Sequence, residues 1–240
     1  MEPRKDLTPE EMADGPTPAD SPDEYFRKAR AFTEKYYWKE MVHIWSTKFE
    51  EVGPNHFFLE YVWVVHATGF NAKVVAKLMP RLTAAYGIGE DGSGWDRLGR
   101  DDEGSMLSRV LKVCNNPQKA KAVHSTAKLM ADAMFPADVG KTESWEDFRQ
   151  RRLSSPELLT KLPYVGKITC KHLARNIGIL ECVKPDLHLV RLADHWGFKD
   201  CDEMCLAMKP SEMPLGIVDL ILWYASSTFG TLAARKEGER

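Results

Sequence analysis

The stretch LPYVGKITCKHLARNIGILECVKPDLHLVR, residues 162–191 of this 240-residue chain, contains the pattern most informative about the fold. It predicts a short helix over residues 156–162 and a second helix over residues 167–177, joined by the tight turn PYVG. A helix begins with unpaired N–H groups and the positive end of its dipole. Because Gly166 has no side chain and Lys167 adds positive charge, the turn predicts a site for an anion such as phosphate. Ordinary helical corners share this pattern, so the turn alone leaves both interpretations open.

The stretch ends with an aspartate at the start of another helix. Gly178 ends the preceding helix, a loop runs to Pro185, and Asp186 opens the segment PDLHLVR. Aspartate at this position is a common N-cap, since its carboxylate accepts hydrogen bonds from the first N–H groups of the helix. Asp186 lies 20 residues after Gly166. On its own it predicts a helix cap, and only its distance from the turn gives it further meaning.

The composition is that of an ordinary globular protein. Hydrophobic residues make up 43% and charged residues 28%, and no apolar run approaches the roughly 20 residues that span a bilayer. The formal net charge is −2, yet residues 151–199 hold nine basic against four acidic residues. Such a basic region fits a nucleic-acid partner, although solvated helix faces produce it as well. Five widely spaced cysteines and a polar N-terminus predict reduced thiols in a cytoplasmic protein without a signal peptide.

Outside this stretch, apolar residues recur with helical spacing, and no segment alternates as a strand does. The chain therefore predicts an all-α fold. Residues 1–22 are rich in Pro, Asp, Glu and Ser, which predicts a disordered or loosely packed acidic tail before a domain at 23–240. Helices are expected in an aromatic-rich region at 22–45 and over residues 56–66, 71–86, 105–113, 118–134, 144–152, 187–196, 200–208 and 211–229.

Together, LPYVG and PDLHLVR resemble the helix-hairpin-helix DNA glycosylases with a Gly/Pro-rich loop and an essential aspartate (HhH-GPD), the superfamily of endonuclease III. In that family a hydrophobic-Pro-Gly-hydrophobic-Gly turn precedes a helix, a loop and an Asp-X-His-X-X-Arg sequence. The resemblance follows helix order over about residues 57–196 and is specific over residues 158–191. It implies two helical subdomains with a DNA cleft between them. One is a central part at about 57–178 with the hairpin at 156–177, and the other is formed by residues 23–56 with 186–240.

The resemblance also implies an activity, in which the enzyme flips one nucleotide out of duplex DNA and breaks the bond between base and sugar. Asp186 would stabilise the positive charge that develops on the sugar, or activate water. The implied DNA contacts are Tyr164, Val165, Gly166, Lys167 and Thr169 at the turn, His188 and Arg191 beside the aspartate, and His66 with Asn71, where His66 would fill the gap left by the flipped base. Trp38, Trp45 and Trp223 are candidates for the base pocket, although tryptophans at helical spacing are more often core residues.

Two departures at the turn refine this expectation. Family members that also cut the strand have a lysine two residues after the last glycine of the turn, and here that residue is Ile168. We therefore expect an abasic product without strand cleavage. Lys167 and Lys171 flank this position but point elsewhere on the helix, and residual lyase activity through either stays open. Tyr164 replaces the first glycine of the turn, and a tyrosine tolerates fewer backbone conformations.

The cysteines mark a further departure. Several family members hold an iron–sulfur cluster with four cysteines after the catalytic helix, and here only Cys201 and Cys205 follow Asp186. We therefore expect no iron–sulfur cluster, no other cofactor and no metal site. A monovalent cation at the hairpin is an option that the resemblance adds.

The resemblance and the departures from it thus imply a monofunctional DNA glycosylase with double-stranded DNA as its partner. We expect it to act as a monomer in the cytoplasm, or at the nucleoid in a bacterium. The base stays open among oxidised, alkylated, mismatched and bulky modified bases. The role stays open too, because removal of glucosylated hydroxymethylcytosine from phage DNA would serve antiviral defence rather than base excision repair. A non-catalytic DNA-binding protein with the same hairpin and a helical protein–protein adaptor are the alternatives from other classes.

Overall fold

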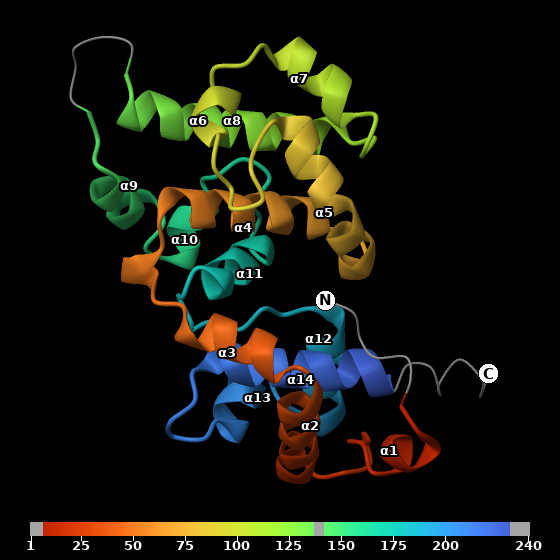
Figure 1. Cartoon of the computed structure of the whole chain (residues 1–240). Helices are drawn as coiled ribbons and strands as arrows, with labels where there is room; N and C mark the ends of the chain where they lie inside the picture. Colours follow the sequence, from red (N-terminus) through yellow and green to blue (C-terminus); the bar gives the residue numbers. More distant parts are fainter. Residues whose placement is uncertain (1–6, 137–141, 231–240) are drawn as a thin grey trace. The chain divides into compact units, whose positions relative to one another are not determined.

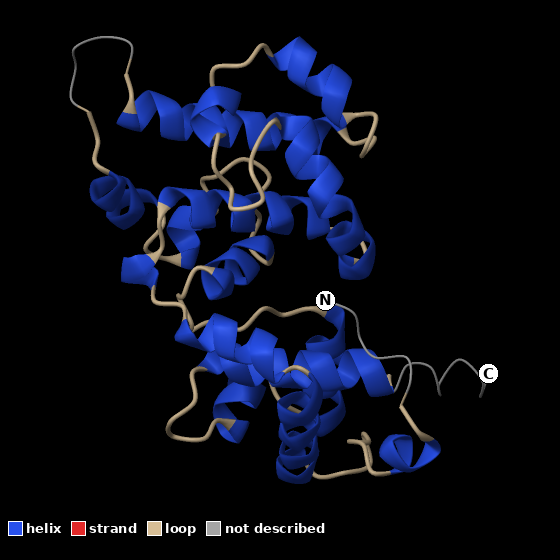
Figure 2. Ribbon diagram, viewed as in Figure 1, coloured by secondary structure: helices blue, strands red, loops and turns tan. Residues whose placement is uncertain are grey.

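In the computed structural model, residues 7–136 and 142–230 are described, and within them the chain is helical and has no β-strand (Figures 1 and 2). The all-α prediction is confirmed. The chain divides into two compact units. Of the described residues, unit 1 holds those between 48 and 179, and unit 2 holds 7–47 together with 180–230. Among the described helices, none is both long enough and apolar enough to cross a bilayer.

Unit 1 is built around α4 (Pro54–Ala67), which is apolar on almost every face. The other elements of the unit are η1 (Phe49–Glu51), α5 (Ala72–Tyr86), α6 (Trp95–Leu98), α7 (Glu103–Val110), α8 (Pro117–Met134), α9 (Trp145–Arg152), α10 (Pro156–Leu159) and α11 (Thr169–Asn176). α4 packs against α5, α8 and α11, and its Phe57, Phe58 and Val62 are fully buried. A helix that is hydrophobic all round is stable only when protein surrounds it.

Unit 2 is built around α14 (Leu215–Phe229), another helix with apolar residues on most faces. The other helices of the unit are α1 (Pro9–Ala13), α2 (Pro22–Tyr36), α3 (Trp38–Ser46), α12 (Leu187–Trp196) and α13 (Cys201–Met208). α14 packs against α2, α3, α12 and α13. Its Ile217, Leu222 and Tyr224 are buried in the core of this unit.

Local capping explains why most helices begin where the sequence predicts. Ser21, Asn116, Ser144, Ser155 and Asp200 each accept a hydrogen bond from an N–H group in the first turn of their helix. The two hairpin helices are shorter than predicted, because α10 ends at Leu159 and α11 begins at Thr169. The residues between them form turns rather than continuing either helix.

Residues 7–22 differ from the expected loose tail. They contain α1, whose start is fixed by a capping box between Thr8 and Glu11. Glu11 also accepts hydrogen bonds from Lys35 Nζ, at 2.8 Å, and from the Tyr36 hydroxyl of α2. These bonds lower the pKa of Glu11 to about 2. One carboxylate of this acidic segment therefore pairs with α2, a contact that composition could not predict. The expectation for residues 1–6 lies outside the described residues.

The unit boundaries also differ from those expected. Residues 48–56 belong to unit 1, where the indole of Trp145 donates to the Val52 carbonyl at 2.7 Å and Arg149 donates to the same carbonyl at 3.2 Å. Residues 180–185, which lay in neither expected subdomain, belong to unit 2, where the Leu180 carbonyl accepts a hydrogen bond from Gly216 N–H at 2.7 Å. These contacts join residues far apart in the sequence, so helical periodicity carries no information about them.

Candidate functional site

The hairpin consists of α10, α11 and residues 160–168 between them, and it is attached to α4. The hydroxyl of Tyr61, on α4, donates to the carbonyl of Pro163 at 2.6 Å. Leu162 and Val165 are buried, and Val165 N–H donates to the Leu162 carbonyl at 3.2 Å. Because its side chain is buried, Val165 can offer DNA only its backbone.

The outer side of the turn is open to solvent. Gly166, Lys167 and Ile168 are exposed, and their N–H groups have no hydrogen-bond acceptor among the described residues. A side chain built at Gly166 would meet nothing within 4 Å. Cys170 N–H donates to the Gly166 carbonyl at 2.8 Å and starts the hydrogen bonding of α11. The turn therefore offers unpaired donors, free space and the charge of Lys167, which together suit an anion.

Tyr164 has a φ of 63°. Within the described ranges, no other non-glycine residue has a positive φ. This left-handed conformation costs a residue with a Cβ roughly 1–2 kcal/mol. The position thus has a backbone conformation that glycine adopts without strain, even though it carries a tyrosine. The ring is 38% exposed and lies 5.9 Å from Nζ of Lys119.

This conformation makes a prediction about two variants at one position. Tyr164→Gly is expected to be more stable to unfolding than Tyr164→Ala by about 1 kcal/mol, because both remove the ring and only glycine adopts a positive φ without strain. Urea unfolding of the two variants under the same conditions measures the difference. Equal stability, or alanine as the more stable residue, would contradict the left-handed conformation at Tyr164.

Lys119, in the first turn of α8, is a residue of this region that the sequence did not single out. It is 1% exposed, and Nζ donates to the carbonyls of His66, at 2.8 Å, and Thr68, at 2.6 Å. Both carbonyls lie at the C-terminal end of α4, where a cation satisfies unpaired oxygens and the negative end of the dipole. Nζ also lies 4.6 Å from the ring centroid of Phe70. Burial lowers the pKa of Lys119.

The structure corrects the expectation for His66, which cannot fill a gap in DNA because it is 2% exposed. Its Nε2 lies 3.0 Å from the hydroxyl of Tyr86. Burial, with a smaller contribution from the charge of Lys119, lowers the pKa of His66 to about 4. The ring is therefore neutral near pH 7 and belongs to the core of unit 1. Its expected neighbour Asn71 is exposed.

Three large side chains around the turn are exposed instead. Phe70, in the loop between α4 and α5, is 51% exposed, and Ile168 is 50% exposed. Tyr164, in the turn itself, is the third. The loop and the hairpin meet where Thr68 Oγ1 lies 3.4 Å from Thr169 Oγ1. Exposed aromatic rings beside unpaired N–H donors suit stacking with nucleic-acid bases.

Asp186 is the N-cap of α12 in unit 2. Its Oδ1 accepts hydrogen bonds from the N–H groups of His188, at 3.0 Å, and Leu189, at 3.2 Å. Its other oxygen, Oδ2, accepts no hydrogen bond within the described ranges. The side chain is partly exposed. The cap thus orients the carboxylate and leaves one oxygen available for chemistry.

The other predicted site residues of unit 2 differ in exposure. His188 and Arg191 are partly buried on α12. Trp45 and Trp223 are partly buried and pack against the core of unit 2, whereas Trp38 is 49% exposed at the start of α3. Of the three tryptophans, Trp38 thus offers the most accessible ring.

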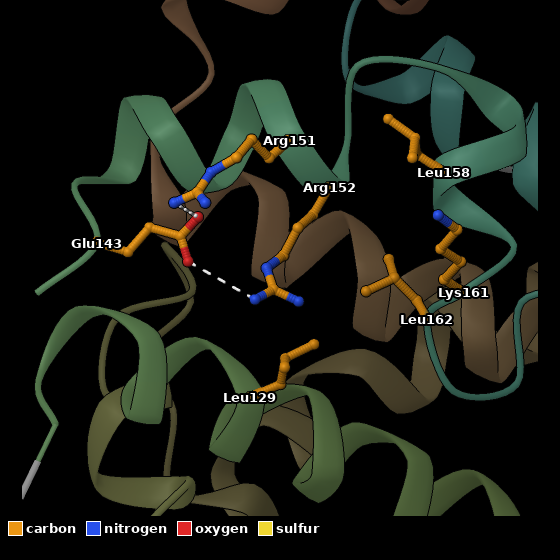
Figure 3. Close-up of a pocket in the computed structure, with 7 residues that line it drawn as sticks. All are labelled: Leu129, Glu143, Arg151, Arg152, Leu158, Lys161 and Leu162. Atoms are coloured by element: carbon orange, nitrogen blue, oxygen red, sulfur yellow. Dashed lines mark ion pairs between the residues drawn. The ribbon is translucent and has the colours of Figure 1, made fainter. Parts of the chain in front are cut away.

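A pocket of about 200 Å³ lies beside the hairpin in unit 1 (Figure 3). It is lined by Leu129, Glu143, Arg151, Arg152, Leu158, Lys161 and Leu162. The guanidinium groups of Arg151 and Arg152 point toward Glu143, with N–O distances of 2.7 and 3.7 Å (Figure 3). None of the described residues that line it has an aromatic ring on which a base could stack.

Cys201 and Cys205 lie in the core of unit 2. Burial, with the negative charge of Asp219, raises the pKa of both thiols, that of Cys201 to about 12. In the protein without a bound metal, this disfavours the thiolate form of both cysteines. Across the described part of the chain, no group of three or more His, Cys, Asp or Glu side chains is arranged to hold a metal ion. The monovalent cation at the hairpin stays a prediction.

No protein-family model and no curated protein matches this chain. A solved structure of a trapped endonuclease III–DNA covalent intermediate, an estranged-adenine complex, is similar to it, with 17% sequence identity and a TM-score of 0.48 over 82% of this chain and 85% of that chain. A likeness of this degree carries no conclusion about activity.

Proposed function

We propose that this protein is a DNA glycosylase that removes a modified or damaged base from double-stranded DNA by hydrolysis and leaves an abasic site. The observation that carries the proposal is a pair of features. One is the turn with unpaired N–H groups at Gly166, and the other is Asp186, 20 residues later, a helix cap with one uncommitted carboxylate oxygen. Each feature alone is common. Their occurrence together at this separation supports the glycosylase.

In this proposal the hairpin binds a phosphate of the DNA backbone. The N–H groups of Gly166, Lys167 and Ile168 donate to phosphate oxygens, and the Lys167 side chain adds charge. Contacts of this kind position a protein on DNA and do not read sequence. Because they displace counterions from the DNA, affinity for duplex should fall steeply as salt rises.

Asp186 carries the chemistry. When the bond between C1′ and the base nitrogen breaks, its electron pair leaves with the base and positive charge develops on the sugar. The Asp186 carboxylate stabilises this charge through Oδ2. The oxygen of a water molecule then bonds to C1′ and releases one proton to Asp186 or to solvent, while the departing base takes up a proton. The products are the free base and an abasic sugar.

The proposal includes no strand cleavage. A lyase needs a reachable neutral amine that forms a Schiff base with the sugar, and the family position for that amine is Ile168. Lys119 Nζ, although its pKa is lowered, is buried and donates to two carbonyls. Lys167 points into solvent at the turn, where it suits a phosphate rather than C1′.

Phe70 replaces His66 in this proposal as the side chain that stacks into the gap left by the flipped base. Stacking between a base and an aromatic ring contributes about 1–3 kcal/mol. Phe70→Ala is therefore expected to weaken binding to duplex with an abasic site by about tenfold or more, with a smaller effect on intact duplex. Fluorescence anisotropy measures both affinities.

Phe135→Ala is the matched control, because Phe135 is also an exposed phenylalanine of unit 1, at 52%. It is expected to bind both duplexes like the unchanged protein. Equal losses in the two variants, or no loss for Phe70→Ala, would rule out Phe70 as the stacking residue.

The experiment that tests the proposed function is a panel of duplexes with oxidised, alkylated, deaminated, mismatched and glucosylated hydroxymethylated bases. Release of the base is measured with and without alkaline cleavage of the abasic site, and in parallel with borohydride. We expect release from at least one duplex, strand breaks only after alkali, and no trapped covalent adduct. A trapped adduct would reject the monofunctional mechanism and direct attention to Lys167 or Lys171.

The same panel separates the remaining roles. Release of glucosylated hydroxymethylcytosine alone would assign the protein to antiviral defence, and release of oxidised or alkylated bases would assign it to base excision repair. Salt-dependent duplex binding without release of any base would leave a DNA-binding protein that uses the hairpin alone.

A further inference from the structure

Asp219 is a buried carboxylate that the proposed reaction does not use. It lies in α14 between apolar neighbours and is 1% exposed. Burying a carboxylate is costly unless hydrogen bonds or charges compensate. Its Oδ2 accepts a hydrogen bond from the backbone N–H of Lys184 at 2.9 Å. Lys184 stands two residues before Asp186 in the loop that enters α12.

This loop is held at both ends by α14. The Leu180 carbonyl accepts from Gly216 N–H at 2.7 Å, and Lys184 N–H donates to Asp219. Val183, between them, is fully buried. The Lys184 carbonyl in turn accepts from Asp186 N–H at 2.8 Å. Lys184 is therefore held by Asp219 through its N–H group and by Asp186 through its carbonyl.

We infer that Asp219 is a positioning residue for Asp186. The Oδ1 cap fixes the Asp186 side chain relative to α12, and Asp219 fixes the backbone from which that side chain projects. A catalytic carboxylate must be held within a fraction of an ångström to stabilise a developing charge. The inference rests on the proposed function, because it takes Asp186 as the catalytic group.

Three variants test it. Asp219→Ala removes the acceptor, and Asp219→Asn keeps an oxygen that can accept from Lys184 N–H. Val218→Ala, at a fully buried neighbouring position of α14, is the control for loss of packing. With enzyme in excess over lesion duplex, we expect Asp219→Ala to lower the single-turnover rate by about tenfold or more with Kd unchanged within about twofold. Asp219→Asn and Val218→Ala should stay within about threefold of the unchanged protein.

Backbone amide hydrogen exchange of the free protein is the second measurement. Asp219→Ala is expected to speed exchange at Lys184 and at the capped amides of His188 and Leu189, whereas Val218→Ala does not. An unchanged excision rate in Asp219→Ala, or an equal slowing in Val218→Ala, overturns the inference. If the unchanged protein releases no base from any duplex, the proposed function fails separately. Hydrogen exchange then decides whether Asp219 holds the loop, and unchanged protection at Lys184 rejects it.

Discussion

Replacing Asp186 with asparagine is expected to lower the single-turnover rate of base release by about a hundredfold or more, while DNA affinity changes by less than about twofold. The carboxylate charge is lost, and with it the stabilisation of positive charge on the sugar. The fold is kept, because asparagine is as good an N-cap as aspartate and its amide oxygen can still accept from His188 and Leu189. The variant thus separates the charge of Asp186 from its capping role.

Asp194→Asn is the control for this measurement. Asp194 is an exposed aspartate on the same helix, and its replacement changes the charge of α12 by the same amount. It is expected to excise at the unchanged rate. The catalytic assignment fails if Asp186→Asn still releases the base, or if Asp194→Asn loses activity equally. Thermal unfolding of both variants checks that neither loss reflects unfolding.

Lys119→Met is expected to have the largest effect on stability, lowering the free energy of unfolding by about 2–4 kcal/mol. Methionine fills a similar volume but leaves the carbonyls of His66 and Thr68 without their donor, and each unsatisfied buried acceptor costs about 1–3 kcal/mol. Relief from burying a charge offsets part of this cost. In a chain of this size the change lowers Tm by about 4–16 °C.

Lys121→Met is the matched control for this prediction. Lys121 also lies in α8, but its side chain is 54% exposed and pairs with Glu103 at the surface. Exposed ion pairs contribute about 1 kcal/mol or less. Urea unfolding should therefore separate the two variants clearly, and equal stability would show that the Lys119 contacts with the end of α4 contribute little.

The two central helices could be predicted from the sequence because their apolar composition is a local property. α4 and α14 are apolar on nearly all faces, and a helix of that composition has to be surrounded by protein. Helix starts at Ser155 and Asp186 were readable for a similar reason, since a cap acts on N–H groups two or three residues away. The hairpin and the candidate carboxylate follow from the same short-range patterns.

The sequence pattern did not predict which single polar residues are buried. Lys119 is one of four lysines between residues 112 and 128, and its contacts with His66 and Thr68, 53 and 51 positions away, distinguish it from the exposed lysines around it. In the same region His66 is buried, contrary to the expectation that it reaches DNA, and Phe70, for which the sequence made no prediction, is exposed. A histidine at a helix end can point either way, and its packing partner Tyr86 comes from another helix.

The sequence by itself thus determined the all-helical class, the hairpin and the aspartate 20 residues after it, because capping and periodicity act within a few residues. Only the tertiary structure decided that Tyr164 adopts a left-handed conformation, that Lys119 closes the end of α4, and that Asp219 holds the loop before Asp186. The contacts of Lys119 and Asp219 join residues 51 and 35 positions apart. Capping and periodicity act over only a few residues, so these patterns cannot reveal which distant segments pack together.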